Sequence, residues 1–143
     1  MITILFVCTG NSCRSQIAEG LLNAKKLTHL DCFSAGISPS RVHPLSIRVL
    51  NEIDIDISHH TSDWVNDFYD FRLDFVITLS TSAKENLPSF DTDPQIIHWD
   101  IDDPYRDFKD DINQLPNYRE TRDLLSQNID AFLVEHKLET AEK

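Results

Sequence analysis

The sequence predicts an α/β fold: a three-layer sandwich with helices on both faces of a central, mainly parallel sheet of four strands. Apolar, β-branched segments alternate with segments of helical periodicity along the chain, which is the order that a parallel sheet with crossover helices requires. The first apolar segment, ITILFVC, is hydrophobic enough to be buried on both faces of such a sheet. A length of 143 residues suits one domain, which we expect over residues 1–138, ahead of a polar tail at 139–143.

Two strands and two helices are expected in the first part of the chain. Residues 2–8 predict the first strand, because apolar and β-branched side chains follow one another without a break. The segment 15–26 repeats apolar side chains at helical spacing, and DCFSAG at 31–36 predicts a short second strand. A second helix is expected from Pro44, because proline is favoured in the first turn of a helix.

Two further strands and a terminal helix are expected in the rest of the chain. RLDFVITLS at 72–80 and QIIHWDI at 95–101 have the length and composition of buried strands. The segment 117–136 predicts an amphipathic helix, whose apolar face contains Leu125, Ile129, Phe132, Leu133 and His136. Trp64 and Trp99 are expected to pack in the core or at its edge.

The charge and the cysteine content exclude several classes of protein. A formal net charge of −11 argues against nucleic acid or an anionic membrane as a partner, because both attract basic surfaces. No apolar run approaches the roughly 20 residues that cross a bilayer, and the N-terminus lacks the features of a signal peptide. Three cysteines are too few for a disulfide framework, so Cys32 is expected to be structural and the protein cytoplasmic.

The loop that follows the first strand has the residues of an oxyanion site. Cys8 ends the strand, Arg14 stands six residues later at the start of the helix, and ligands bind at this end of parallel strands. Backbone N–H groups and the helix dipole make such a loop positive, which suits a tetrahedral oxyanion. The residues between the cysteine and the arginine are short or polar: Thr9, Gly10, Asn11, Ser12 and Cys13.

Each residue type in this loop has a chemical use. Gly10 and Asn11 tolerate the left-handed backbone of a tight loop. The planar fork of Arg14 can bind two oxygens of one anion, and the positive potential favours the thiolate form of Cys8. Ser15 could donate its hydroxyl to that thiolate. A single cysteine at a strand end is more often a small buried hydrophobe, and it is the strand–loop–helix context that favours catalysis here.

The segment VCTGNSCRSQIAEG resembles the active-site loop of the low-molecular-weight protein tyrosine phosphatase superfamily, and most closely that of its arsenate reductase branch. Gln16, where typical phosphatases have proline, favours the reductase branch. The resemblance extends along most of the chain, through SAGI at 34–37, HPLSI at 43–47, IDISHHTSD at 55–63, VITL at 76–79 and HWDIDDP at 98–104.

The resemblance implies catalytic roles for the matching residues. Cys8 is the implied nucleophile and Arg14 the oxyanion clamp, while Asn11 orders the loop and Ser15 stabilises the thiolate. The implied general acid is Asp103, and a carboxyl group close to an anion and a thiolate is favoured in its protonated form. From the residues alone, the acidic stretch could instead be a solvated loop, and the neighbouring carboxyl groups Asp100 and Asp102 are alternatives for the acid.

Reductase relatives also bind a potassium ion beside this loop. The matching positions carry oxygen, as a hard cation requires: Asn11, Glu19, Ser34 and Asp63. Each of these side chains could equally serve as a helix cap or a loop hydrogen bond. No other cofactor is expected, because the six histidines show no metal-binding spacing, and His59 and His60 are expected to be solvated.

The chain departs from the reductase branch at the cysteines that carry oxidising equivalents away from the nucleophile. Ser80 and Leu87 stand at the positions of the two resolving cysteines, and Ser82 at a third position that some relatives use. A serine cannot form a disulfide, so the intramolecular relay by thiol–disulfide exchange is absent. Cys13 could pair with Cys8, but that pairing would protect the nucleophile rather than support turnover.

Two enzymatic functions remain, and the residues favour hydrolysis of a phosphate monoester, either of a phosphorylated small molecule or of a phosphotyrosine protein. Tyr105 resembles the aromatic wall of a phosphotyrosine slot, although Ser40 stands near the position of the opposite wall. The alternative is an arsenate reductase that borrows an external thiol, such as glutathione or mycothiol, with a glutaredoxin-like partner. A non-enzymatic oxyanion-binding role is disfavoured, because nucleophile, clamp and acid are all present.

Overall fold

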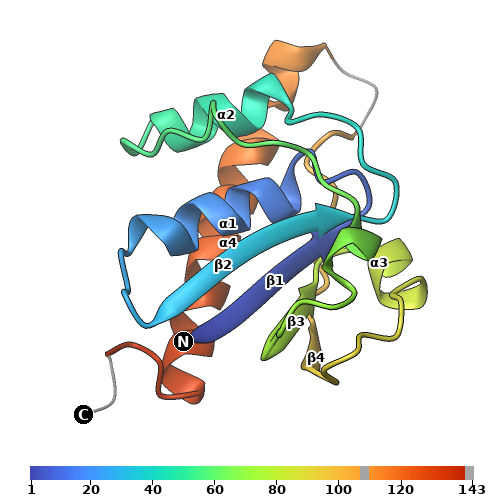
Figure 1. Ribbon diagram of the computed structural model, residues 1–143. Helices are drawn as coiled ribbons and strands as arrows, with labels where there is room; N and C mark the ends of the chain where they lie inside the picture. Colours follow the sequence, from blue (N-terminus) through green and yellow to red (C-terminus); the bar gives the residue numbers. More distant parts are fainter. Residues whose placement is uncertain (107–109, 141–143) are drawn as a thin grey trace.

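The computed structural model describes residues 1–106 and 110–140, and its centre is a sheet of four parallel strands (Figure 1). The strands are β1 (Ile2–Cys8), β2 (Leu30–Gly36), β3 (Phe75–Thr78) and β4 (Gln95–His98), in the spatial order β2-β1-β3-β4. All three neighbouring pairs are parallel, which confirms the predicted sheet.

Helices cover both faces of the sheet and complete the three layers (Figure 1). One face carries α1 (Arg14–Ala24), α2 (Pro44–Asn51) and α4 (Asp111–Glu135), and the other carries the 3₁₀ helix η1 (Val65–Phe68) and α3 (Thr81–Glu85). The side chains of β1 alternate between the two faces, as the pleat of a strand requires. Ile4 and Phe6 join the larger core with the long helices, whereas Leu5 and Val7 join the smaller one.

The strand register places the end of β1 at the edge of the sheet where the polar loops meet. Cys8 pairs with Gly36 at the end of β2, and Val7 pairs with Thr78 at the end of β3. Because all these strands end at the same edge, the segments that follow them can contribute to one site. The fold therefore positions Cys8 between the loops that follow β2 and β3.

Several element boundaries differ from those that the sequence predicted. The strands β3 and β4 are shorter than the expected segments 72–80 and 95–101. The helix α4 begins at Asp111 instead of residue 117 and contains Pro116, which removes one helical hydrogen bond and crowds the carbonyl one turn earlier. The short elements η1 and α3 were not expected, since four or five residues are too few to show a period.

The two tryptophans lie in different environments. Trp99 is half-buried against Phe6 and Phe132, at ring-centroid distances of 6.0 and 6.2 Å. Trp64 is 47% exposed, so its expected place in or beside the core is wrong. Cys32 is buried in the larger core, in agreement with a structural role.

Within residues 1–106 and 110–140, no helix combines the length and the apolar character that crossing a membrane demands. Of the expected tail at 139–143, residues 141–143 lie outside the described residues, and the domain boundary at 138 stays a prediction.

Candidate active site

A pocket of about 230 Å³ opens at the carboxyl edge of the sheet, directly above the end of β1. It brings together a thiol, a guanidinium and a carboxyl group from segments that are far apart in the sequence. The lining residues are Cys8, Thr9, Gly10, Ser12, Cys13, Arg14, His43, Asp103 and Tyr105. The arrangement can bind a small oxyanion and offer it both a nucleophile and a proton donor.

The Cys8 sulfur has a hydroxyl donor within reach. Its Sγ lies 2.8 Å from Oγ of Ser15, and both side chains are buried. Oγ of Ser15 also accepts a hydrogen bond of 2.7 Å from Nδ2 of Asn11. Because a hydroxyl has a single hydrogen, this leaves the Ser15 hydrogen available to the sulfur of Cys8. This geometry allows the Ser15 hydroxyl to donate to Cys8, and its role in stabilising a thiolate stays a prediction.

Asn11 determines the shape of the loop. It has a φ of 47°, the left-handed backbone that asparagine adopts more readily than other residues with a Cβ. Its Nδ2 also donates to Oγ of Ser34 at 2.9 Å, and its Oδ1 accepts from the backbone N–H of Asp63 at 2.8 Å. The expectation of a left-handed backbone at Gly10 is wrong, because no glycine has a positive φ; a Cβ at Gly10 would lie 3.3 Å from Oγ of Ser40.

Gln16 was not predicted to act in the site, yet its side chain joins the loop that follows Cys8 to the segment around Thr61. Its Nε2 donates to the backbone carbonyl of Asn11 at 3.1 Å and to that of Thr61 at 2.8 Å. Its Oε1 lies 2.9 Å from Nδ1 of His60, so this ring nitrogen carries the proton. His60 is therefore half-buried, not solvated as expected, and burial lowers its pKa.

Arg14 opens α1 and reaches across the pocket. Its Nη1 donates to the backbone carbonyl of Ile101 at 3.0 Å. This hydrogen bond holds the start of the acidic segment, DIDDPYR at 100–106, beside the loop. Only one of its five N–H groups makes a hydrogen bond to the described protein, so the fork keeps donors for an oxyanion. The role of Arg14 as an oxyanion clamp stays a prediction.

Among the three acidic candidates, only Asp103 lines the pocket, and Asp100 and Asp102 do not. Oδ1 of Asp103 accepts a hydrogen bond of 3.0 Å from the backbone N–H of Tyr105. The Tyr105 hydroxyl donates to Oδ1 of Asp111 at 2.7 Å, and this hydrogen bond raises the pKa of Tyr105. The acidic segment is thus connected to the beginning of α4.

His43 is a further residue of the pocket that sequence reasoning missed. Its Nδ1 accepts a hydrogen bond of 3.1 Å from the backbone N–H of Leu45 and so caps α2. The ring packs between Tyr105 and Tyr118, at centroid distances of 5.3 and 5.4 Å. Burial lowers the pKa of His43, which favours the neutral ring that a capping acceptor requires. The only signal in the sequence is a polar side chain directly before Pro44.

The family model of the low molecular weight phosphotyrosine protein phosphatases matches residues 3–143. The chain belongs to this family. Arsenate reductase 2 of Staphylococcus saprophyticus is 44% identical over 102 residues, which are 71% of this chain and 78% of that protein.

Solved structures of both kinds of family member resemble the fold. An arsenate reductase in its oxidised state superposes with a TM-score of 0.79 at 32% identity, over 94% of this chain and 98% of the other. A low molecular weight protein tyrosine phosphatase from T. tengcongensis gives a TM-score of 0.75 at 28% identity, over 94% and 99% of the two chains. The protein is therefore an enzyme of the phosphatase and arsenate reductase kind.

In this member of the phosphatase family, the residues implied for potassium form one connected group. Oγ of Ser34 donates to Oε1 of Glu19 at 2.5 Å and accepts from Asn11, whose amide oxygen accepts from the Asp63 backbone. Burial raises the pKa of Glu19 to about 7, and the nearby Asp63 carboxylate contributes to the rise. Two carboxyl groups, a hydroxyl and an amide oxygen are a donor set that fits a hard cation.

The serines at the positions of the resolving cysteines contact the phosphatase-family loop directly. Oγ1 of Thr9 lies 3.1 Å from Oγ of Ser80 and 2.7 Å from Oγ of Ser82. Leu87 packs against the smaller core, on the face that carries η1 and α3. None of the three cysteines forms a disulfide.

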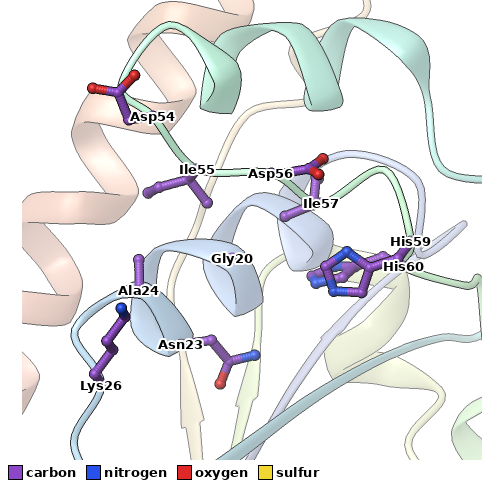
Figure 2. Close-up of a pocket in the computed structure, with 10 residues that line it drawn as sticks. All are labelled: Gly20, Asn23, Ala24, Lys26, Asp54, Ile55, Asp56, Ile57, His59 and His60. Atoms are coloured by element: carbon purple, nitrogen blue, oxygen red, sulfur yellow. The ribbon is translucent and has the colours of Figure 1, made fainter.

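A second hollow, of about 320 Å³, lies between the end of α1 and the segment that follows α2 (Figure 2). Neither cysteine nor arginine occurs among its lining residues, which are Gly20, Asn23, Ala24, Lys26, Asp54, Ile55, Asp56, Ile57, His59 and His60. Cys8 and Arg14, the candidate nucleophile and clamp, line the smaller pocket, which is therefore the candidate reaction site.

Proposed function

We propose that the protein is a phosphate-monoester hydrolase that works through a cysteinyl-phosphate intermediate. The observation that carries this proposal is that Cys8, Arg14 and Asp103 line a single pocket. They supply a nucleophile, an anion-binding group and an acid, so the proposed reaction needs no cofactor.

In the first step, the loop backbone, the N-terminus of α1 and the guanidinium of Arg14 bind the phosphate dianion. The thiolate of Cys8 attacks phosphorus, and the bond from phosphorus to the ester oxygen breaks as the S–P bond forms. Asp103 gives its proton to the departing oxygen, which leaves as an alcohol. Only Asp103 among the acidic candidates lines the pocket that holds the sulfur.

In the second step, water attacks the phosphorus of the cysteinyl phosphate and inorganic phosphate is released. The Asp103 carboxylate takes a proton from this water, so the acid of the first step becomes the base of the second. Cys8 departs as a thiolate, and the hydroxyl of Ser15, 2.8 Å from the sulfur, stabilises it. This hydrogen bond supports both the formation of the nucleophile and its release.

The pocket favours small aryl phosphates over phosphotyrosine in proteins. Tyr105 is 42% exposed and offers one aromatic wall beside the loop. Ser40, near the expected position of the opposite wall, donates to the Gly10 carbonyl at 3.5 Å and contributes no ring. A slot with a single aromatic wall holds a substrate ring less firmly than one with two.

Arsenate reduction is the second candidate, because the curated relatives are named arsenate reductases. In this reaction Cys8 forms an S–As bond to arsenate with loss of water. An external thiol, such as glutathione or mycothiol, attacks Sγ of Cys8, and the S–As electron pair reduces arsenic(V) to arsenite. A second thiol, or a glutaredoxin-like partner, then reduces the mixed disulfide. The serines beside Thr9 explain why the thiol must come from outside.

The two candidates are separated by measuring both reactions with one preparation. We expect hydrolysis of p-nitrophenyl phosphate without any thiol donor, and no repeated turnover of arsenate with glutathione and glutaredoxin. Repeated arsenite production at a rate above ester hydrolysis would overturn the proposal in favour of the reductase. Cys8→Ser is the control, because it should abolish both reactions while phosphate still binds to the loop.

We also propose that side-chain oxygens of Asn11, Glu19, Ser34 and Asp63 bind a potassium ion. The cation would offset the charge of the buried Glu19 carboxylate and stabilise the side chains that hold Asn11 in place. Its chemistry is electrostatic only, and no step of the reaction passes through it.

A further inference from the structure

Arg106 connects the acidic segment of the pocket to α4. Its Nη1 donates to the backbone carbonyl of Asp103 at 2.9 Å, and its Nη2 donates to Oδ1 of Asn117 at 3.3 Å. The backbone N–H of Arg106 donates to Oε1 of Gln114 at 3.0 Å. One residue therefore joins the backbone of the general-acid candidate to the first turns of a long helix.

The partners of Arg106 on α4 lie on one face of the helix, and the two amides among them are hydrogen-bonded to each other. Gln114, Asn117 and Glu120 are spaced three residues apart, which places them along one face of the helix. Gln114 is fully buried, and its Oε1 also accepts from Nδ2 of Asn117 at 3.1 Å. Glu120 is 3.6 Å from Nη2 of Arg106 but is largely exposed, so this ion pair contributes little. The hydrogen bonds to the two amides hold the arginine.

Besides Arg106, the segment that carries Asp103 is fixed mainly by Tyr105, which donates to Asp111 and packs against His43. Asp102, Asp103 and Tyr105 are exposed, and Pro104 is the buried residue among them. Where few apolar side chains are buried, the polar contacts determine how precisely a backbone is held. The start of the segment is fastened by Arg14, through the carbonyl of Ile101, and Arg106 fastens the other side of Asp103.

We propose that Arg106 is a positioning residue for the general acid, one that holds the Asp103 carboxyl within reach of the leaving-group oxygen. This inference rests on the proposed ester hydrolysis. A misplacement of about 1 Å can cost up to about 100-fold in rate, so a backbone anchor can matter without touching the substrate. Arg106 acts through Asp103, and its effect should depend on how much the reaction needs a proton.

The test is Arg106→Ala, measured as kcat/KM for two esters. An alkyl phosphate needs its leaving oxygen protonated, whereas p-nitrophenolate leaves readily without a proton. We expect a loss of up to about 100-fold for the alkyl ester, a much smaller loss for p-nitrophenyl phosphate, and unchanged binding of tungstate. In an Asp103→Asn background, Arg106→Ala should cause no further loss, because the group it positions is gone.

Arg119→Ala is the matched control, since this arginine lies on α4 itself and pairs with Glu52, away from the reaction pocket. It should leave both kcat/KM values unchanged. Equal losses for the two esters, or a full loss in the Asp103→Asn background, would overturn the positioning role.

A second measurement separates this proposal from the proposed function. The backbone N–H of Tyr105 is bonded to the Asp103 carboxylate, so its hydrogen exchange reports how firmly that carboxyl is held. We expect faster exchange in Arg106→Ala and no change in Arg119→Ala. If the parent chain hydrolyses no ester, the proposed function fails, and the exchange result alone decides: unchanged exchange in Arg106→Ala overturns the positioning role, and faster exchange supports it.

Discussion

Gly36 lies against the backbone of Asn11 so closely that no side chain fits between them. A Cβ at Gly36 would be 2.7 Å from the backbone nitrogen of Asn11 and 2.8 Å from the carbonyl oxygen of Thr9. The same approach lets the chain after β2 bond to the loop, with Ile37 N–H donating to Cys8 and Ser38 N–H to Thr9. The end of β2 and the residues after it thus pack directly against the backbone of the loop that follows Cys8.

Gly36→Ala should weaken oxyanion binding and ester hydrolysis together, because the loop backbone must move to admit the methyl group. We expect a stability loss of about 1–3 kcal/mol, typical of overpacking. Gly20→Ala is the comparison, since a Cβ there would meet side chains, Leu50 and Ile57, away from the pocket. Urea unfolding and tungstate titration of both variants measure the effect. Equal affinity for tungstate in the two variants would contradict the prediction.

Asp103→Asn should slow the hydrolysis of esters with poor leaving groups by roughly 10²–10⁴-fold, the usual contribution of a general acid. The loss should shrink as the leaving group improves, because a good leaving group departs without a proton. The slope of log kcat/KM against leaving-group pKa, for a series of aryl phosphates, measures this dependence. A small, uniform loss, with a larger one in Asp102→Asn, would assign the acid to Asp102.

Glu19 should make the free energy of unfolding depend on pH. Its pKa is raised from 4.5 to about 7 in the folded protein, so between these values the unfolded chain loses the proton and the folded chain keeps it. Stability therefore falls as the pH rises through this range, by at most roughly 3.5 kcal/mol at about 1.4 kcal/mol per pKa unit. Glu19→Gln should remove this pH dependence of the free energy of unfolding.

Potassium should also reduce the fall in the free energy of unfolding with rising pH, because a bound cation favours the carboxylate of Glu19. The comparison is urea unfolding at about pH 5 and about pH 8, in potassium chloride and in tetramethylammonium chloride. The same pH dependence in the parent chain and in Glu19→Gln would show that this carboxyl is not its source.

Ser80→Ala should lower stability by about 1 kcal/mol, because Oγ of Ser80 caps α3 by accepting from the backbone N–H of Ala83 at 3.2 Å. Ser82→Ala keeps the cap and removes only the contact with Thr9, so it should cost less. Chemical unfolding of the two variants provides the measurement. A larger loss in Ser82→Ala would mean that the contact with Thr9 matters more than the cap.

The sequence predicted the sheet and the reactive loop because their signals are local. The apolar run of β1, the spacing of Cys8 and Arg14, and the alternation of elements can each be read within short stretches. The predicted start of α4, at residue 117, is too late, because the polar segment before it shows no apolar period although it is helical from Asp111. The elements η1 and α3 are too short for any periodicity to indicate them.

The residues that the sequence did not reveal act through distant partners. His43 meets Tyr105, and Arg106 meets Asn117, only because the segments after β2 and β4 converge on α4. No spacing rule links such pairs, since their separation along the chain depends on the loops between them. Gln16 stood in the recognised motif, but its bond to the carbonyl of Thr61 required the folded chain to be seen.

The three hydrogen-bond partners of the Asn11 side chain lie 4, 23 and 52 residues further along the chain, in α1, in β2 and at Asp63. A peptide that carries only CTGNSCR contains none of these partners, so nothing would hold its asparagine in the left-handed conformation. The expected affinity for oxyanions is in this sense a property of the assembled domain, and we expect it to be lost when the sheet unfolds. Grafting this heptapeptide onto another protein would transfer its sequence without the contacts that hold the loop in shape.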